Sequence, residues 1–237
     1  PPCADIDGDG DFDAFVGKFN SNGNDSLVFF QNTGTVNSPI FTAAVADPFG
    51  LDEGGYITYN TNPNFFDIDD DGDLDAFIGY QEWQSYSATA FYRNIGTVNN
   101  PLFYFDNVKQ FGLRERGNSS LSFVDIDADG DLDAFGNKAV FYQNMGAANI
   151  PAFYGNASFG LSGIGLYGYT YATTVDIDGD GDFDVFVGAY DGSTLFFQNT
   201  GTANSPAFAA AIANPFGLSN VASNYPTSSS AFADIDD

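Results

Sequence analysis

Aspartates recur at fixed spacing in four stretches of the sequence. In the first, DIDGDGDFD from Asp5 to Asp13, carboxylates stand at positions 1, 3, 5, 7 and 9, and glycine stands at position 6. DIDDDGDLD from Asp67, DIDADGDLD from Asp125 and DIDGDGDFD from Asp176 repeat this spacing. Alternate residues of a tight loop point the same way, so the carboxylates at positions 1, 3 and 5 converge. Such a cluster of hard oxygen donors suits a divalent cation.

We name the residues of these aspartate loops by their position in the loop. The position-1 aspartates are Asp5, Asp67, Asp125 and Asp176, and the position-3 aspartates are Asp7, Asp69, Asp127 and Asp178. The position-5 aspartates are Asp9, Asp71, Asp129 and Asp180, and the position-7 aspartates are Asp11, Asp73, Asp131 and Asp182. The position-9 aspartates are Asp13, Asp75, Asp133 and Asp184. The chain ends in DIDD, which adds Asp234 and Asp236 to the candidate metal ligands.

Calcium is the predicted cation, at about four ions per chain. The backbone carbonyl of position 7 adds an oxygen and glycine at position 6 permits the sharp turn, whereas magnesium demands a smaller octahedral cage. An EF-hand would need glutamate at position 12, but that position holds Val16, Ile78, Gly136 and Val187. A solvated Asp-Gly turn is the alternative for a single motif, and four unbroken copies argue against it. Without a cation the clustered carboxylates would repel one another.

Composition excludes several other functions. Six Lys and Arg against 32 Asp and Glu give a net charge of −26, which argues against nucleic acid and anionic membranes as partners. There is no histidine, and Cys3 is the only cysteine, so histidine acid–base chemistry, Cys/His zinc sites and intrachain disulfides are excluded. No apolar span is long enough for membrane insertion. Only eight acidic residues lie outside the motifs, without paired placement, so we expect no enzyme activity.

The elements that must position these loops also repeat. Four stretches follow the aspartate loops in register: FFQNTGT at Phe29, FYRNIGT at Phe91, FYQNMGA at Phe141 and FFQNTGT at Phe196. The first aspartates of the four loops and of the terminal DIDD lie 62, 58, 51 and 58 residues apart. The chain is therefore read as one domain, 1–237, with repeats at 5–66, 67–124, 125–175 and 176–233, and with 234–237 as the start of a further repeat or a closing strand. Each repeat offers four short strands, typified by NFFDID, DAFIG, TAFYRN and PLFYF. These features predict an all-β fold, a β-propeller of four-stranded antiparallel blades.

The repeat resembles the FG-GAP family and its bacterial relatives, the VCBS repeats, known from the propeller of integrin α subunits. The resemblance rests on the aspartate loops, on a Phe-Gly pair in each unit and on a glycine after the second strand. The pairs begin at Phe49, Phe111, Phe159 and Phe216, and the glycines are Gly17, Gly79 and Gly188. It implies calcium in hairpin loops on one face of a propeller, usually seven-bladed, with adhesion or ligand binding on the other. The chain departs from the family in lacking the proline of the Gly-Ala-Pro tripeptide, in a third repeat shortened around Asn137 to Ala139, and in having four complete repeats.

We therefore expect a non-catalytic, calcium-stabilised, secreted or cell-surface propeller for adhesion or self-assembly. Its partners would be other copies of itself, or an extracellular protein or glycan. The alternative is a carbohydrate-binding accessory propeller of a secreted polysaccharide-degrading enzyme. Trp83, Tyr86 and Tyr190, in loops that vary between repeats, are candidate sugar or protein contacts, and ordinary surface variation explains them equally well. Lys109, Arg114 and Arg116 form either a patch for an acidic neighbour or simply solvated charge.

A last expectation concerns the two ends of the chain. The segment around Ser228 to Asp234 reads as a first strand, and we expect it to pair with the strand near Asp13 to Gly17. Pairing within the chain would close a ring, whereas pairing between chains would give a head-to-tail filament, which we favour, with Cys3 beside the junction. A third alternative is that the chain is part of a longer array.

Overall fold

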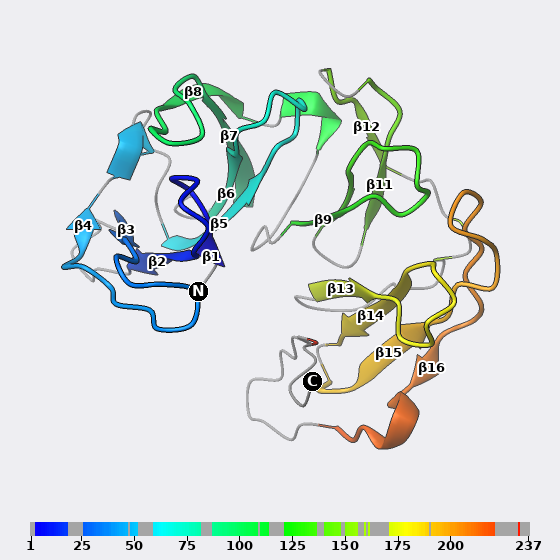
Figure 1. The fold of residues 1–237 in the computed structure, drawn as a ribbon. Coiled ribbons are helices and arrows are strands. Elements are labelled where there is room, and N and C mark those ends of the chain that lie inside the picture. The colour runs from blue at the N-terminus through cyan, green and yellow to red at the C-terminus, as the bar shows by residue number, and fades with distance from the viewer. Residues whose placement is uncertain are drawn as a thin grey trace. The chain divides into compact units, whose positions relative to one another are not determined.

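The computed structural model describes most of the chain, and the statements below concern that part. The described residues are 3–18, 26–46, 48–51, 59–81, 87–108, 110–113, 121–136, 140–147, 150–155, 159, 161, 171–189, 191–220 and 232. Within them the regular elements are β-strands and single 3₁₀ turns (Figure 1). No helix among these residues is long and apolar enough to cross a membrane.

The strands form four sheets of four strands each, and every sheet is an antiparallel meander in chain order. The first sheet holds β1 (Cys3–Ala4), β2 (Asp13–Lys18), β3 (Ser26–Phe30) and β4 (Val45–Ala46), and the second holds β5 (Tyr59–Phe66), β6 (Asp75–Gln81), β7 (Ser87–Asn94) and β8 (Phe103–Val108). The third holds β9 (Ser122–Val124), β10 (Asp133–Phe135), β11 (Phe141–Asn144) and β12 (Phe153–Gly155), and the fourth holds β13 (Tyr171–Val175), β14 (Asp184–Gly188), β15 (Thr194–Phe197) and β16 (Ile212–Ala213). The fold is thus a β-propeller of four four-stranded antiparallel blades, which confirms the predicted fold class.

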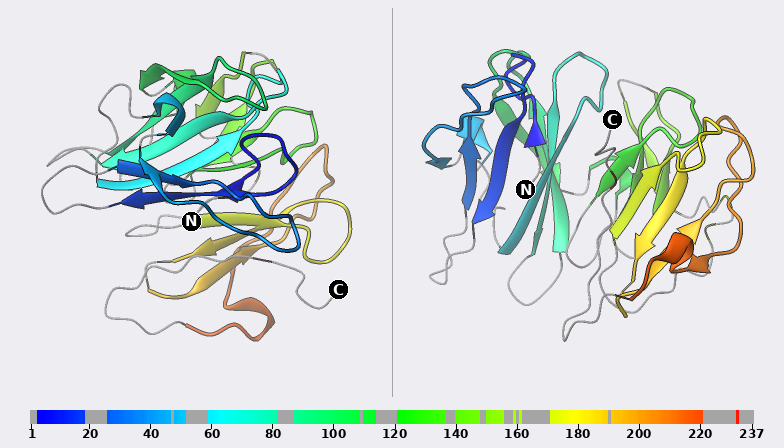
Figure 2. Two further views of the ribbon diagram at one scale, coloured as in Figure 1. Left: turned by 60° about the vertical axis from the view of Figure 1, so that its left-hand side comes forward. Right: turned by 60° about the horizontal axis from the view of Figure 1, so that its bottom comes forward.

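The blades fall into two compact units. Unit 1 comprises Pro1–Ser119 with Ala148–Pro151, and it contains the first and second blades. Unit 2 comprises Ser120–Ala147 with Ala152–Asp237, and it contains the third and fourth blades. Figure 2 shows the four strands of a blade lying side by side within each unit.

Within each unit the two blades pack face to face through aromatic and branched side chains. In unit 1, Phe15 of β2 lies against Phe65 of β5, with ring centroids 4.4 Å apart, in a core that also holds Leu51 and Phe103. In unit 2, Ile126 and Phe135 of the third blade join Val185 and Phe197 of the fourth in the corresponding core. A blade buries its second face only against a neighbour, and this explains why the apolar pattern repeats with the blades.

Three of the four Phe-Gly pairs form one-turn 3₁₀ elements after the last strand of a blade: η1 (Pro48–Gly50), η2 (Gln110–Gly112) and η4 (Pro215–Gly217). Gly160 of the remaining pair lies outside the described residues. In η1 both residues of the pair adopt left-handed φ, 58° for Phe49 and 87° for Gly50. The phenylalanine ring packs on the third strand of its own blade, as Phe49 does on Phe29 at 4.9 Å. A Cβ on Gly50 would meet the backbone oxygen of Phe103 at 2.8 Å, so glycine permits close packing of the second blade.

The first blade has a short first strand of its own. β1 pairs Cys3 with Ala14 and Ala4 with Asp13 of β2. These are two of the β2 positions at which we expected the segment near Ser228 to Asp234 to pair. That segment lies outside the described residues apart from Phe232, so the expected strand pairing stays a prediction.

Candidate metal sites

Each aspartate loop connects the first and second strands of its blade. The loops cover residues 5–12, 67–74, 125–132 and 176–183, between β1 and β2, β5 and β6, β9 and β10, and β13 and β14. The structure brings the carboxylates of positions 1, 3 and 5 together in all four loops, with one oxygen from each residue within 4.8 Å of the others. Four groups of aspartates could therefore each hold a metal ion.

Backbone N–H groups of the loop fix the position-1 carboxylate. In the second loop, the amide of Asp71 donates to Oδ1 of Asp67 at 3.1 Å, and the amide of Gly72 donates to Oδ2 at 3.0 Å. The other three loops repeat both bonds at 3.0 to 3.2 Å. Gly72, at position 6 of this loop, adopts a φ of 94°, which a residue with a Cβ rarely does. Glycine at this position therefore allows the loop to close.

The position-9 aspartates start the second strand of each blade and are almost fully buried, at 1% exposure in all four loops. One carboxylate oxygen, Oδ1, accepts the backbone N–H of the asparagine after the third strand. These bonds run from Asn32, Asn94, Asn144 and Asn199 and measure 2.6 to 2.7 Å. The other oxygen, Oδ2, is buried and has no hydrogen-bond partner among the described residues in any of the four loops. A buried charged oxygen without a partner is costly, so its repeated presence points to a bound cation.

Electrostatics supports the same interpretation. Burial is the main cause that raises the pKa of Asp13 to about 6 and those of Asp75 and Asp133 to about 7, and neighbouring loop carboxylates add to the shift. Burial also raises the pKa of Asp184. Backbone N–H donors oppose this effect, because a hydrogen bond to the charged form stabilises that form. A divalent ion in the loop would reverse the local balance and keep these carboxylates ionised.

The position-7 aspartates offer side-chain oxygens in addition to the expected backbone carbonyl. One side-chain oxygen is buried and lacks a hydrogen-bond partner within the described residues in three loops, at Asp11, Asp73 and Asp182. Burial is again the first cause of the raised pKa of Asp11, followed by Asp9, Asp7 and Asp5. The side chain at position 7 is therefore a further candidate ligand.

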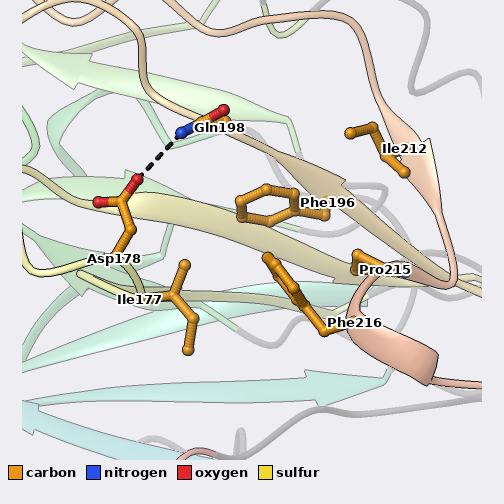
Figure 3. Close-up of a pocket in the computed structure, with 7 residues that line it drawn as sticks. All are labelled: Ile177, Asp178, Phe196, Gln198, Ile212, Pro215 and Phe216. Atoms are coloured by element: carbon orange, nitrogen blue, oxygen red, sulfur yellow. Dashed lines mark hydrogen bonds between the residues drawn. The ribbon is translucent and has the colours of Figure 1, made fainter.

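Sequence reasoning missed the residues that hold the loops from outside. In each blade, the residue just before the asparagine that donates to position 9 holds the position-3 aspartate. Its side chain donates to Oδ2 of that aspartate: Gln31 to Asp7 at 2.8 Å, Gln143 to Asp127 at 2.9 Å and Gln198 to Asp178 at 2.9 Å. Figure 3 shows the last of these bonds. In the second blade Arg93 takes this place and forms an ion pair with Asp69. The recurring FFQN, FYRN and FYQN motifs carried this information, but they indicated only the period of the repeat and not a contact with the loops.

The asparagine of these motifs also has a structural role. The Oδ1 atom of Asn94 accepts the backbone N–H groups of Gly96 and Leu102, both at 3.0 Å, and thereby ties the turn after β7 to the start of the last strand. The same two bonds recur at Asn32, Asn144 and Asn199. Each asparagine therefore links a position-9 aspartate to the outer part of its blade.

Several predicted residues lie outside the part that the structure describes. These are the candidate ligands Asp234 and Asp236, the loop aromatics Trp83, Tyr86 and Tyr190, and the cations Lys109, Arg114 and Arg116.

Comparison of the chain with models of known protein families gives no match, and comparison with curated protein sequences gives none either.

Proposed function

We propose that this chain is a non-catalytic, calcium-binding β-propeller of the FG-GAP type. The observation that supports this proposal best is the buried, unpartnered Oδ2 of the position-9 aspartate, which recurs in four loops. Each loop offers carboxylates at positions 1, 3, 5 and 9 together with the oxygens of position 7. Such an all-oxygen, carboxylate-rich set suits calcium, whereas magnesium usually keeps several waters and binds one or two carboxylates.

The proposed location is outside the cell, either secreted or at the cell surface. The position-5 aspartates are exposed, so each loop lies open to solvent on one side. Exposed loops of this kind suit the weak affinities of extracellular calcium modules, with dissociation constants of about 10⁻⁴ to 10⁻³ M. Fluorescence of a labelled chain on intact producing cells, before and after a non-permeant protease, tests this proposal; protection of all the protein from the protease would contradict it.

A lack of catalysis accords with the acidic residues outside the aspartate loops. Among the described residues these are Asp106 and Asp191. Asp191 accepts hydrogen bonds from the backbone and hydroxyl of Ser193, and Asp106 lies 3.8 Å from Arg93. Neither arrangement offers the pair of carboxylates that glycoside hydrolysis requires.

The fourth blade supports a role in self-assembly. In unit 1, Ile6 and Leu51 of the first blade are 3% and 0% exposed because the second blade covers them. Their counterparts in the fourth blade, Ile177 and Leu218, are 40% and 46% exposed, and Phe216 is 71% exposed. Figure 3 shows Ile177 and Phe216 lining a hollow beside Phe196 and Ile212. An exposed apolar patch of this kind typically marks an interaction site.

The proposed occupant of this patch is a blade from a second copy of the chain. In both units a blade of the same repeat covers the equivalent face, so the required shape already exists within the molecule. Phe232 lies against Phe186 with ring centroids 4.6 Å apart, much as Phe65 lies against Phe15 at 4.4 Å. This similarity supports the proposal that the segment around Phe232 acts as the first strand of a further blade, taking the place of the two-residue β1 beside β2 of a second copy. Head-to-tail addition of this kind would build a filament.

Light scattering over a range of concentrations tests the assembly. In calcium we expect the mean mass to rise with concentration, and the double substitution Phe216→Ser, Leu218→Ser to abolish that rise. Val36→Ser, at an apolar side chain elsewhere that is 68% exposed, is the control and should leave the mass unchanged. A monomer at all concentrations would contradict self-assembly, and selective binding on a glycan array would instead favour the carbohydrate-binding alternative.

A further inference from the structure

We propose that Arg93 weakens calcium binding in the second loop, so that this loop fills last of the four. The inference rests on the proposed calcium-binding function and adds a rank order to its sites. It starts from one sequence difference: glutamine follows the third strand's aromatic pair in the first, third and fourth blades, and arginine stands there in the second.

The position of this side chain gives it direct influence on the site. In the first and third loops glutamine holds Oδ2 of the position-3 carboxylate, while Oδ1 is buried without a partner within the described chain. The pinned oxygen thus fixes the carboxylate, and the free oxygen is the one available to a cation. Arg93 holds Asp69 in the same way, and Oδ1 of Asp69 is likewise buried and unpartnered. Arg93 is therefore a positioning residue, as the glutamines are.

Charge is what distinguishes Arg93 from the glutamines. An amide donor orients the carboxylate and leaves its negative charge for the cation, whereas a guanidinium neutralises part of that charge and repels the cation. Even at the dielectric constant of water, a unit charge about 6 Å from a divalent ion lowers the affinity for that ion about tenfold. Asp69 is only 8% exposed, so solvent screens its pair with Arg93 less than it screens a surface pair.

Other contacts keep Arg93 beside the loop. Its Nε lies 3.8 Å from Oδ2 of Asp106, and its guanidinium carbon lies 5.7 Å from the centre of the Phe91 ring. The second loop also carries an additional aspartate, Asp70, at position 4. Asp70 is exposed, so salt screens its attraction for the ion. The charge of Arg93 beside the buried Asp69 therefore decides the difference between the loops.

The experiment is a calcium titration of the full-length, ¹⁵N-glycine-labelled chain, followed by NMR in 150 mM KCl. The amides of Gly10, Gly72, Gly130 and Gly181 at position 6 report the four loops separately. We expect the Gly72 signal to reach its midpoint at a calcium concentration roughly three- to tenfold higher than the other three, the lower value applying where salt screens the charge.

Three variants separate charge from hydrogen bonding and from folding. Arg93→Gln should bring the Gly72 midpoint to the range of the other loops, and Arg93→Lys should keep it high because the charge remains. Gln143→Arg is the reciprocal change and should weaken only the loop of Gly130. Unchanged signals from the remaining glycines show that each variant folds.

The outcomes distinguish this inference from the function on which it rests. Equal midpoints in the four loops, or an unchanged Gly72 midpoint in Arg93→Gln, would overturn the role of Arg93 while leaving calcium binding intact. No response of any glycine up to millimolar calcium would overturn the calcium-binding function itself.

Discussion

At the scale of single residues, the position-9 aspartate best separates a metal site from an ordinary acidic turn. The exposed carboxylates at position 5 could be solvated by water without cost. Asp75, by contrast, is buried at the start of β6. One of its carboxylate oxygens accepts a hydrogen bond from the backbone N–H of Asn94, and the other has no partner in the described structure. A proton, a cation or an ordered water can satisfy that oxygen, and only a cation makes the effect of a substitution depend on calcium.

The substitution Asp75→Asn should therefore have opposite effects with and without calcium. In calcium it removes one ligand, and we expect about one ion fewer per chain and a loss of roughly 2.7 kcal/mol of stability at a free concentration about 100 times the dissociation constant. In the metal-free protein it removes a buried charge, and the melting temperature should rise. Calorimetry measures both effects. Asp70→Asn, in the same loop but exposed, is the control; if the two variants behave alike, position 9 has no special role.

The pH dependence of the metal-free protein follows from the raised pKa values. Asp13 has a folded pKa of about 6, and Asp75 and Asp133 have values of about 7, all above the value of about 3.9 in an unfolded chain. Between these values the folded state binds more protons than the unfolded state, so the free energy of unfolding should fall as pH rises from 5 to 8. Urea unfolding after removal of metal measures this trend. Saturating calcium should abolish the decrease, and a decrease that persists unchanged would show that the ion does not reach these carboxylates.

The loop carboxylates could be identified from the sequence because a metal-binding loop is defined by the types and spacing of neighbouring residues. Sequence reasoning did not identify Gln31, Arg93 or the asparagines, since these lie 11 to 24 residues after the aspartates that they contact and approach them only through the antiparallel pairing of the second and third strands. Nor did spacing alone distinguish the buried oxygen of position 9 from the exposed ones. That distinction depends on which carboxylate begins a strand inside the blade.

At the scale of elements, strand alternation and turn residues were sufficient to predict the blade. The stretches NFFDID, DAFIG, TAFYRN and PLFYF correspond to β5, β6, β7 and β8, in the predicted order and pairing. The short β1 was not expected, because Cys3 and Ala4 offer too few residues for a strand pattern. The left-handed phenylalanine of η1 could not be predicted either, since its conformation depends on packing against Phe29 and on the approach of the next blade.

The Phe-Gly element offers a matched pair of substitutions. Gly50→Ala places a Cβ 2.8 Å from the backbone oxygen of Phe103 and also strains a left-handed residue, φ 87°. Gly217→Ala meets no described atom within 4 Å but carries a similar φ of 83°. We expect about 1 kcal/mol of destabilisation for Gly217→Ala and roughly 2–4 kcal/mol for Gly50→Ala. Denaturant unfolding compares them; equal losses would show that the element does not seat the neighbouring blade.

At the scale of the whole molecule, the repeat explains why the chain carries so much negative charge and how the fold accommodates it. Most of the net charge of −26 resides in four short loops, one per blade. The strands of the same sheet hold each loop, and Asn99 and Asn204 of the neighbouring blades also donate to backbone carbonyls of the first and third loops. Cation binding should therefore stabilise the chain blade by blade, because the ligands of a site belong to one loop. The apolar face of the fourth blade connects this local chemistry to the proposed assembly, because a blade must be well ordered before it can receive a neighbour.

The central claim is that these four loops bind calcium. Equilibrium dialysis of the metal-free chain against radioactive calcium, in excess magnesium, tests it most directly, with melting temperature recorded on the same samples. The account predicts about four ions per chain, the last bound more weakly than the others, and a melting temperature that rises by many degrees as the ions bind, at roughly 2.7 kcal/mol per site when calcium is about 100 times its dissociation constant. Binding of no calcium, or an unchanged melting curve at saturation, would contradict it.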